Sequence, residues 1–215
     1  LPFSVVVTGY GLTEGGTAAA TSPGDDPETI ATTVGRPRPG FELRIVDPSG
    51  AEVPHGEPGE VLLRGGSIMS HYLDDPGATT ATLSPDGWLR TGDLGTVDGD
   101  GYLRIVGRSK DMFIVGGFNA YPAEIENALL RHPDIRQAAV IGMPDDRLGE
   151  MIVAVIQIDA NTDQAALAAE LKSGATASLA RYKLPDRYIF RTTLPRNSMG
   201  KVERQKVRQE ILATS

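Results

Sequence analysis

In the second half of the chain, segments with the apolar pattern of a strand alternate with segments that have the apolar pattern of a helix. Short runs rich in valine, isoleucine and alanine are typical of buried strands. Longer segments place apolar residues three and four positions apart, which brings them to one face of a helix. The predicted strands are residues 135–142, 151–158 and 188–191, and the predicted helices are residues 122–131, 164–179 and 203–212. This alternation predicts a small α+β domain from about residue 111 onward, with three or four strands and three helices.

The first half has shorter apolar runs separated by turn signals. Most of the 25 glycines and 15 prolines precede Asp111, which is typical of a β-rich, turn-rich segment. A barrel-like or meander arrangement is expected, with residues 3–7 as a buried strand and residues 18–30 as a mobile loop. Further strands are predicted at residues 34–38, 42–46 and 59–64, and short helices at residues 68–73 and 76–83.

Residues 101–126 connect the two halves. A strand at residues 102–106 runs into the polar segment 107–111, and a second apolar run, residues 112–115, precedes Gly116 and Gly117. Pro122 begins the helix that follows, since proline suits a first helical turn and has no N–H to leave unpaired. The polar segment has two interpretations, a tight hairpin with solvated charges or a joint between two domains.

Composition excludes several classes of function. The net charge is -7 and the pI is about 5.0, so no broad basic surface for nucleic acid is expected. With no cysteine and three widely spaced histidines, a thiolate metal site or a zinc cluster is not expected. No apolar run approaches the roughly 20 residues that span a bilayer. These features predict a cytoplasmic protein without a transmembrane segment.

Two segments contain candidate ligand-binding residues. Glycines surround Thr13 and Glu14, whose hydroxyl and carboxylate are hard oxygen ligands that suit Mg²⁺, although a plain glycine-rich turn explains the pattern as well. Asp93 lies between glycines in a predicted turn, where its carboxylate accepts either ribose hydroxyls or its own backbone N–H. Lys201 follows Gly200, but Val202 replaces the hydroxyl residue of a phosphate-binding P-loop.

Taken together, four segments resemble the adenylate-forming superfamily, which includes acyl-CoA synthetases, peptide-synthetase adenylation domains and firefly luciferase. They are YGLTE (10–14), WLRTGDL (88–94), residues 101–126 and PRNSMGKVERQKV (195–207). The resemblance covers essentially the whole chain. It implies that residues 1–109 are the C-terminal, β-rich part of the large domain and that residues 110–215 are the small mobile α+β domain. Members of this family convert a carboxylic acid and ATP into an acyl-adenylate, and a thiol then displaces AMP.

The resemblance also implies roles for individual residues. In the nucleotide site it places Tyr10 against adenine, Gly11 as a further nucleotide-binding position, Thr13 at phosphate, Glu14 at Mg²⁺, Asp93 and Arg108 at the ribose, and Ile105 beside adenine. Lys201 matches the catalytic lysine of adenylation, and Lys110 matches the hinge, where several relatives have Asp. Gly116 and Gly117 match the turn that lines the tunnel for the pantetheine arm of CoA.

One departure affects what these 215 residues can do. The family's Ser/Thr/Gly-rich phosphate loop and its acid-binding walls do not occur in this sequence, so the isolated chain is expected to be inactive. The predicted substrates and cofactors are a small-molecule carboxylic acid, ATP, Mg²⁺ and CoA, and a homodimer is left open. The alternatives are a fatty acyl-AMP ligase that loads a carrier protein, or a non-catalytic binding module.

Overall fold

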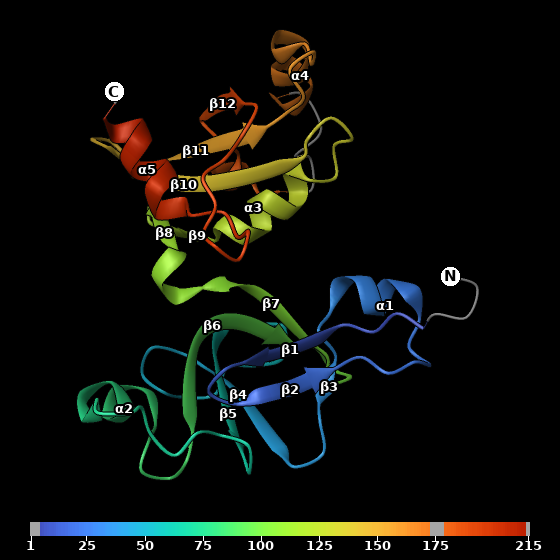
Figure 1. Cartoon of the computed structure of the whole chain (residues 1–215), viewed down its shortest axis with the longest axis vertical. Coiled ribbons are helices and arrows are strands. Elements are labelled where there is room, and N and C mark those ends of the chain that lie inside the picture. Colours follow the sequence, from blue (N-terminus) through green and yellow to red (C-terminus); the bar gives the residue numbers. More distant parts are fainter. Residues whose placement is uncertain (1–4, 173–178, 214–215) are drawn as a thin grey trace. The chain divides into compact units, whose positions relative to one another are not determined.

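The computed structural model describes residues 5–172 and 179–213. It divides into two compact units, a first unit of Leu1–Lys110 and a second unit of Asp111–Ser215. Figure 1 colours the first unit blue to green and the second unit yellow-green to red. Strands dominate and helices are few and short, which confirms the predicted α+β class. Within the described residues, no helix has the length and apolar character needed to cross a membrane.

The first unit consists of two antiparallel sheets. One sheet contains β1 (Gly9–Leu12), β2 (Gly16–Ala20) and β3 (Arg36–Pro37), and the other contains β4 (Phe41–Val46), β5 (Gly59–Gly65), β6 (Leu89–Val97) and β7 (Leu103–Arg108). The strands predicted at residues 42–46, 59–64 and 102–106 are confirmed, and the strand predicted at residues 34–38 is shorter than expected.

A single apolar core lies between these sheets. Ala18 and Ala19 of β2 are fully buried in the same cluster as Val61, Leu63 and Leu103 of the larger sheet. Two backbone hydrogen bonds connect the edges, because Val34 N donates to Leu103 O and Leu103 N donates to Gly35 O, both at 2.8 Å. The β-rich unit is therefore held by shared packing and by direct backbone pairing.

Two predictions for the first 30 residues are wrong. Residues 5–7 form no strand and their valines are exposed, because pairing with β2 begins only where Thr21 N donates to Thr8 O at 2.8 Å. Apolar character alone does not form a strand without a neighbour for its backbone groups. Residues 3 and 4 of that predicted strand lie outside the described residues. Residues 18–30 are not one loop, since they contain part of β2 and most of α1 (Pro27–Thr32).

Of the two predicted short helices, one forms. α2 (Pro76–Thr82) begins where Asp75 caps it by accepting from Ala78 N at 2.8 Å. Residues 68–73 are irregular, which contradicts the prediction. Met69 N donates to Glu14 O and Tyr72 N donates to Thr79 Oγ1, so these donors bond to other segments instead of to the preceding helical turn.

The second unit contains a five-stranded sheet of order β10-β11-β8-β9, with β12 parallel to β11. Its strands are β8 (Phe113–Val115), β9 (Phe118–Ala120), β10 (Gln137–Asp145), β11 (Gly149–Gln157) and β12 (Arg187–Arg191), and its helices are α3 (Pro122–Leu129), α4 (Gln164–Glu170) and α5 (Arg204–Leu212). The three predicted helices and the strands near residues 137, 151 and 188 are confirmed, whereas β9 was missed. Residues 173–178 of the helix predicted at 164–179 lie outside the described residues.

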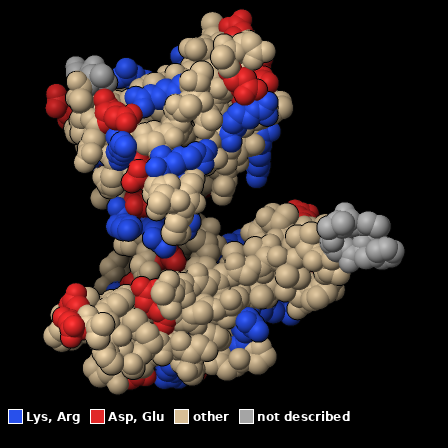
Figure 2. Space-filling model, viewed as in Figure 1, with Lys and Arg blue, Asp and Glu red and all other residues tan. Residues whose placement is uncertain are grey.

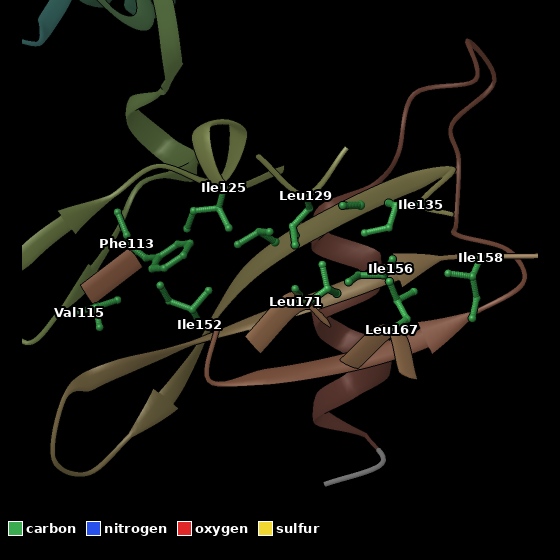
Figure 3. Close-up of a cluster of buried hydrophobic side chains, with 14 residues drawn as sticks. Phe113, Val115, Ile125, Leu129, Ile135, Ile152, Ile156, Ile158, Leu167 and Leu171 are labelled. Atoms are coloured by element: carbon green, nitrogen blue, oxygen red, sulfur yellow. The ribbon is translucent and has the colours of Figure 1, made fainter. Parts of the chain in front are cut away.

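Helices cover both faces of this sheet. Ile125 and Leu129 of α3 lie with Ile152 and Ile156 of β11 in one cluster, which Figure 3 shows. The alternate residues of β11, such as Val153, belong to a second cluster with Val207 and Ile211 of α5. Because both faces are buried, the strand sequence is almost continuously apolar and does not alternate with polar residues.

The polar segment between the units is not a hairpin. β7 pairs with β6 in one sheet, and β8 pairs with β9 and β11 in another. A short 3₁₀ helix, Ser109–Asp111, lies between them. The hairpin interpretation is therefore wrong, since the apolar runs on either side of the segment belong to different sheets.

Leu129 and its neighbour Leu130 offer a matched test of the α3 packing. Leu129 is fully buried, whereas Leu130 is 37% exposed. Leu129→Ala is expected to lower the free energy of unfolding by about 2–5 kcal/mol, the usual cost of an internal cavity. Leu130→Ala should cost less than about 1 kcal/mol. Urea unfolding followed by far-UV circular dichroism measures both, and equal losses would contradict the packing described for this helix.

Candidate active site

Asp93 lies in a bulge of β6 that its sequence context explains. Leu94 pairs with Glu60 and Arg90 pairs with Leu62, so three residues of β6 lie opposite Val61 alone. Gly92 adopts a φ of 68°, a conformation that favours glycine. Thr91 Oγ1 donates to Val61 O at 2.7 Å and accepts from Asp93 N at 3.0 Å. The Thr-Gly-Asp sequence thus builds a bulge that turns the Asp93 side chain away from its regular position.

The carboxylate of Asp93 is buried and has two protein partners. Tyr10 of β1 donates its hydroxyl to Oδ2 at 2.6 Å, and Arg108 of β7 donates Nε to Oδ1 at 2.9 Å. Asp93 and Arg108 are directly paired across β6 and β7, so their side chains share a face of the sheet. The interpretation of Asp93 as a turn residue that bonds its own backbone is wrong. Three strands from two sheets bring Tyr10, Asp93 and Arg108 together.

The ring of Tyr10 is buried and does not form an exposed aromatic surface. It is 9% exposed, and its ring belongs to the core cluster of the first unit. Burial raises the pKa of its hydroxyl well above the usual value, and the hydrogen bond to the Asp93 carboxylate raises it further. The phenol therefore stays protonated and remains a donor to Asp93 over the whole neutral range. Sequence reasoning had not predicted this role for the hydroxyl.

Glu14 lies in the turn between β1 and β2 and has a partner that the sequence did not reveal. It is half-buried, and Tyr72 donates its hydroxyl to Oε1 at 2.8 Å. This hydrogen bond raises the pKa of Tyr72. No local pattern identifies Tyr72, because it lies 58 residues from Glu14 and outside any predicted motif. Thr13, in the same turn, is exposed.

Gly11 is required by the same turn. A Cβ at this position would lie 2.2 Å from Gly16 O, so any side chain would collide with the backbone of β2. Within the described residues, no three His, Asp or Glu side chains gather as a metal site. The Glu14 carboxylate is of the kind that binds Mg²⁺ together with phosphates and water.

Lys201, in the second unit, lies at the end of a tight loop. Arg196 and Val202 form an isolated bridge, and Asn197 accepts at Oδ1 from Met199 N at 3.0 Å and from Lys201 N at 2.9 Å. Lys201 itself is exposed, and among the described residues no carboxylate forms an ion pair with it. The loop holds the backbone of Lys201 while leaving its ammonium group available.

Gly116 and Gly117 form the two-residue turn between β8 and β9. Val115 pairs with Phe118, and the two glycines have φ of 57° and 88°. Two consecutive positive φ values are typical of the I′ hairpin turn, which itself accounts for the Gly-Gly sequence. Nothing lies within 4 Å of a Cβ built on Gly117, so space around it is open. Phe118 stacks on Tyr182, with ring centroids 4.9 Å apart.

The remaining predicted positions are Ile105 and Lys110. Ile105 of β7 is half-buried against the first core, and Lys110 is exposed in the 3₁₀ helix that follows β7. On the face of the second unit drawn in Figure 2, basic and acidic side chains are interspersed. Ion pairs of the second unit include Arg136–Asp159 and Arg191–Glu210.

Comparison with known families gives two matches. Residues 2–73 match the family described as AMP-binding enzyme. Residues 124–201 match the family described as AMP-binding enzyme C-terminal domain. The first match ends before Asp93 and the second begins after Lys110, so the bulge and the joint lie between the two matched regions.

Curated relatives and solved structures agree with these matches. The chain is 47% identical over 97% of its length to the 3-(7a-methyl-1,5-dioxo-octahydro-1H-inden-4-yl)propanoyl:CoA ligase of Mycobacterium tuberculosis. It is 45% identical over 94% of its length to the indoleacetate–CoA ligase of Aromatoleum aromaticum. The structure of o-succinylbenzoate CoA synthetase from Bacillus subtilis with its acyl-adenylate intermediate matches 94% of the chain with a TM-score of 0.84 and 32% identity. The chain spans 39% of each relative and 40% of that structure.

The raised pKa of Tyr10 gives a test by alkaline titration. An unfolded tyrosine ionises near pH 10, whereas folded Tyr10 holds its proton to higher pH. Above about pH 10 the unfolded state therefore binds fewer protons, and stability falls as pH rises by about 1.4 kcal/mol per pH unit from this group. Tyr10→Phe should lose that contribution and should also lose the last phenol to ionise in an ultraviolet titration. If Tyr10→Phe instead removes a phenol that ionises near pH 10 in the wild-type titration, the site geometry is contradicted.

Proposed function

Because this chain belongs to the family of AMP-binding enzymes, we propose that it forms part of an ATP-dependent acyl-CoA synthetase. The enzyme activates a carboxylic acid as an acyl-adenylate and then transfers the acyl group to CoA. The acid's carboxylate oxygen attacks the α-phosphorus of ATP, and the bond from that phosphorus to the bridging oxygen breaks to release pyrophosphate. The thiol of CoA then attacks the acyl carbon, loses its proton, and AMP leaves.

The cluster of Tyr10, Asp93 and Arg108 is the observation that supports this proposal most. A carboxylate offers about four acceptor positions, and Tyr10 and Arg108 occupy two of them. The other two suit the adjacent hydroxyls of a ribose. Arg108 uses only Nε in this contact and keeps its terminal N–H groups for the nucleotide. In this proposal Tyr10 fixes the carboxylate, and Ile105 and Gly11 complete the side of the site nearest adenine.

Lys201 acts in adenylation as the group that neutralises charge. Negative charge builds on the oxygens of the α-phosphoryl group as the acid attacks, and an ammonium group placed there stabilises the transition state. The loop from Arg196 to Val202 supports this role, because it holds the lysine backbone while the ammonium group has no carboxylate partner among the described residues.

Glu14 would hold Mg²⁺ and Thr13 would contact the phosphates of ATP. Glu14 receives one hydrogen bond, from Tyr72 to Oε1, which orients the carboxylate and leaves Oε2 available. When bound, the ion supplies positive charge that offsets charge on the phosphates.

In this proposal the two units belong to two domains, and the small domain rotates relative to the large domain between the half-reactions. Residues 1–109 are the C-terminal part of the large domain, residues 110–215 are the small mobile domain, and Lys110 is the hinge. A hinge of a few residues is sufficient for such a change. Gly116 and Gly117 line the pantetheine tunnel in the second geometry, in agreement with the open space beside Gly117.

The acids named for the two relatives guide the choice of substrate. One is a propanoate on an octahydroindene ring and the other is indoleacetate. We propose a small-molecule acid with a short carboxylate arm on a ring system, and CoA as the acceptor. A carrier-protein acceptor is the second candidate, and thioester assays with CoA and with a carrier protein distinguish the two.

The proposal is tested by acid-dependent exchange of pyrophosphate into ATP, measured on the full-length enzyme with a panel of cyclic and fatty acids. Lys201→Ala should lower exchange about 10²–10³-fold, the usual loss when one transition-state donor is removed. It should keep thioester formation from supplied acyl-adenylate. Lys206→Ala, an exposed lysine of α5, is the control and should be close to wild type. Absence of exchange with every acid, or normal exchange by Lys201→Ala, would refute the assignment.

The hinge is tested separately with Lys110→Pro and Lys110→Ala. Proline fixes φ and removes an N–H donor, whereas alanine removes only the side chain. Lys110→Pro should lose one half-reaction and largely keep the other, with thioester formation the expected loss because it follows the rotation. Lys110→Ala should retain both. If Lys110→Pro performs both half-reactions at normal rates, Lys110 is not the hinge.

A further inference from the structure

Arg204 occupies a position in which arginine is electrostatically unfavourable. It is the first residue of α5, and the positive end of the helix dipole lies there. Glu203, at the N-cap, makes no side-chain capping bond. Neither helix propensity nor capping therefore explains a cation at this point, so the explanation must come from its contacts.

Those contacts join two other segments of the second unit. Arg204 donates Nε to Glu126 Oε1 at 2.7 Å and Nη2 to Glu126 Oε2 at 2.5 Å, the paired geometry that only a guanidinium provides. Its Nη1 donates to Asp111 Oδ2 at 3.2 Å. Glu126 lies in α3 and is 8% exposed, and it also accepts from Val140 N of β10 at 2.9 Å. One guanidinium therefore ties α5 to α3 and to the first residue after Lys110, and Glu126 in turn accepts from β10.

Arg204 also lies directly after the Lys201 loop. The loop closes through the bridge between Arg196 and Val202, and Glu203 N donates to Pro195 O at 3.0 Å. Within the loop, Arg196 donates Nη1 to Gly200 O at 2.8 Å. These bonds close the loop on itself. Val202 packs against the apolar cluster that contains α5, and Arg196 donates Nη2 to Gln157 Oε1 at 3.4 Å. The bonds from Arg204 add an attachment to α3 and to Asp111.

We propose that Arg204 is a positioning residue that fixes the Lys201 loop to α3 and to the segment beginning at Asp111, so that loop and segment move as one body. The inference rests on the proposed function, because it is the adenylation step that requires Lys201 at one place. Displacement of a reacting group by about 1 Å costs on the order of 10²-fold in rate. Arg204 itself need not touch the substrate.

The test is Arg204→Lys, which keeps a positive charge beside buried Glu126 and removes the paired geometry. Arg208→Lys is the matched control, since Arg208 lies one turn later in α5 and donates Nε only to Gly142 O at 3.0 Å. Amide hydrogen exchange needs no enzymatic activity. In Arg204→Lys, exchange should accelerate in the peptide covering residues 196–203 and in the peptide beginning at residue 111. In Arg208→Lys both peptides should keep wild-type rates.

Kinetics separate positioning from general destabilisation. Arg204→Lys should slow adenylation about 10–100-fold, mainly in kcat, with little change in KM for ATP. In a Lys201→Ala background it should have almost no further effect on adenylation, because it acts through Lys201. Equal losses of adenylation rate in both backgrounds would overturn the proposal. Wild-type amide hydrogen exchange in residues 196–203 of Arg204→Lys would also overturn it.

A second variant approaches the contact from its other side and guards against a folding defect. Glu126→Gln keeps an oxygen to accept from Val140 N but removes the charge that Arg204 binds. It should reproduce both the faster exchange and the slower adenylation of Arg204→Lys, whereas a wild-type result would refute the proposal. If the wild-type enzyme adenylates no acid, the proposed function fails. The amide hydrogen-exchange measurement still decides the role of Arg204.

Discussion

The buried carboxylate of Asp93 is the constraint on which the candidate nucleotide site depends. A carboxylate in this position is costly unless charged or polar partners surround it. Tyr10 and Arg108 supply these partners from β1 and β7, so satisfying one charge aligns strands of both sheets of the first unit. The bulge in β6 aims the side chain, and its own backbone donors are satisfied by Thr91 and Glu60. The requirement of one polar group thus organises a site out of three separate strands.

The second unit meets a different requirement, because its sheet must be covered on both faces. α3 packs on one face and α5 on the other, in two distinct clusters of buried side chains. Packing fixes the axis of α5 but leaves the start of the helix dependent on polar contacts. The pair of Glu126 and Arg204 supplies them where the Lys201 loop enters α5. Apolar burial therefore sets the scaffold, and in our proposal one ion pair sets the local position of the exposed lysine.

Unused hydrogen-bonding capacity separates the candidate ligand-binding charges from the structural ones. Glu126 directs both oxygens at the guanidinium of Arg204 and also accepts from Val140 N. Asp93 and Glu14 each retain acceptor positions beyond their protein partners. The glycines are less specific, since the hairpin turn at Gly116 and Gly117 requires them for conformational reasons alone. A motif residue can serve a backbone need and a ligand at the same position.

The sequence by itself determined the α+β class, most strands and helices of the second unit, and the resemblance to the adenylate-forming family. Periodicity and short motifs are local, so one sequence contains them. Only the tertiary structure decided that residues 5–7 form no strand and that Ala18 and Ala19 are core residues, because both depend on which neighbour is present. It also decided the contacts of Tyr72 with Glu14 and of Arg204 with Glu126, 58 and 78 residues apart. Such pairs leave no local pattern, because the folded chain and not the adjacent sequence brings their atoms together.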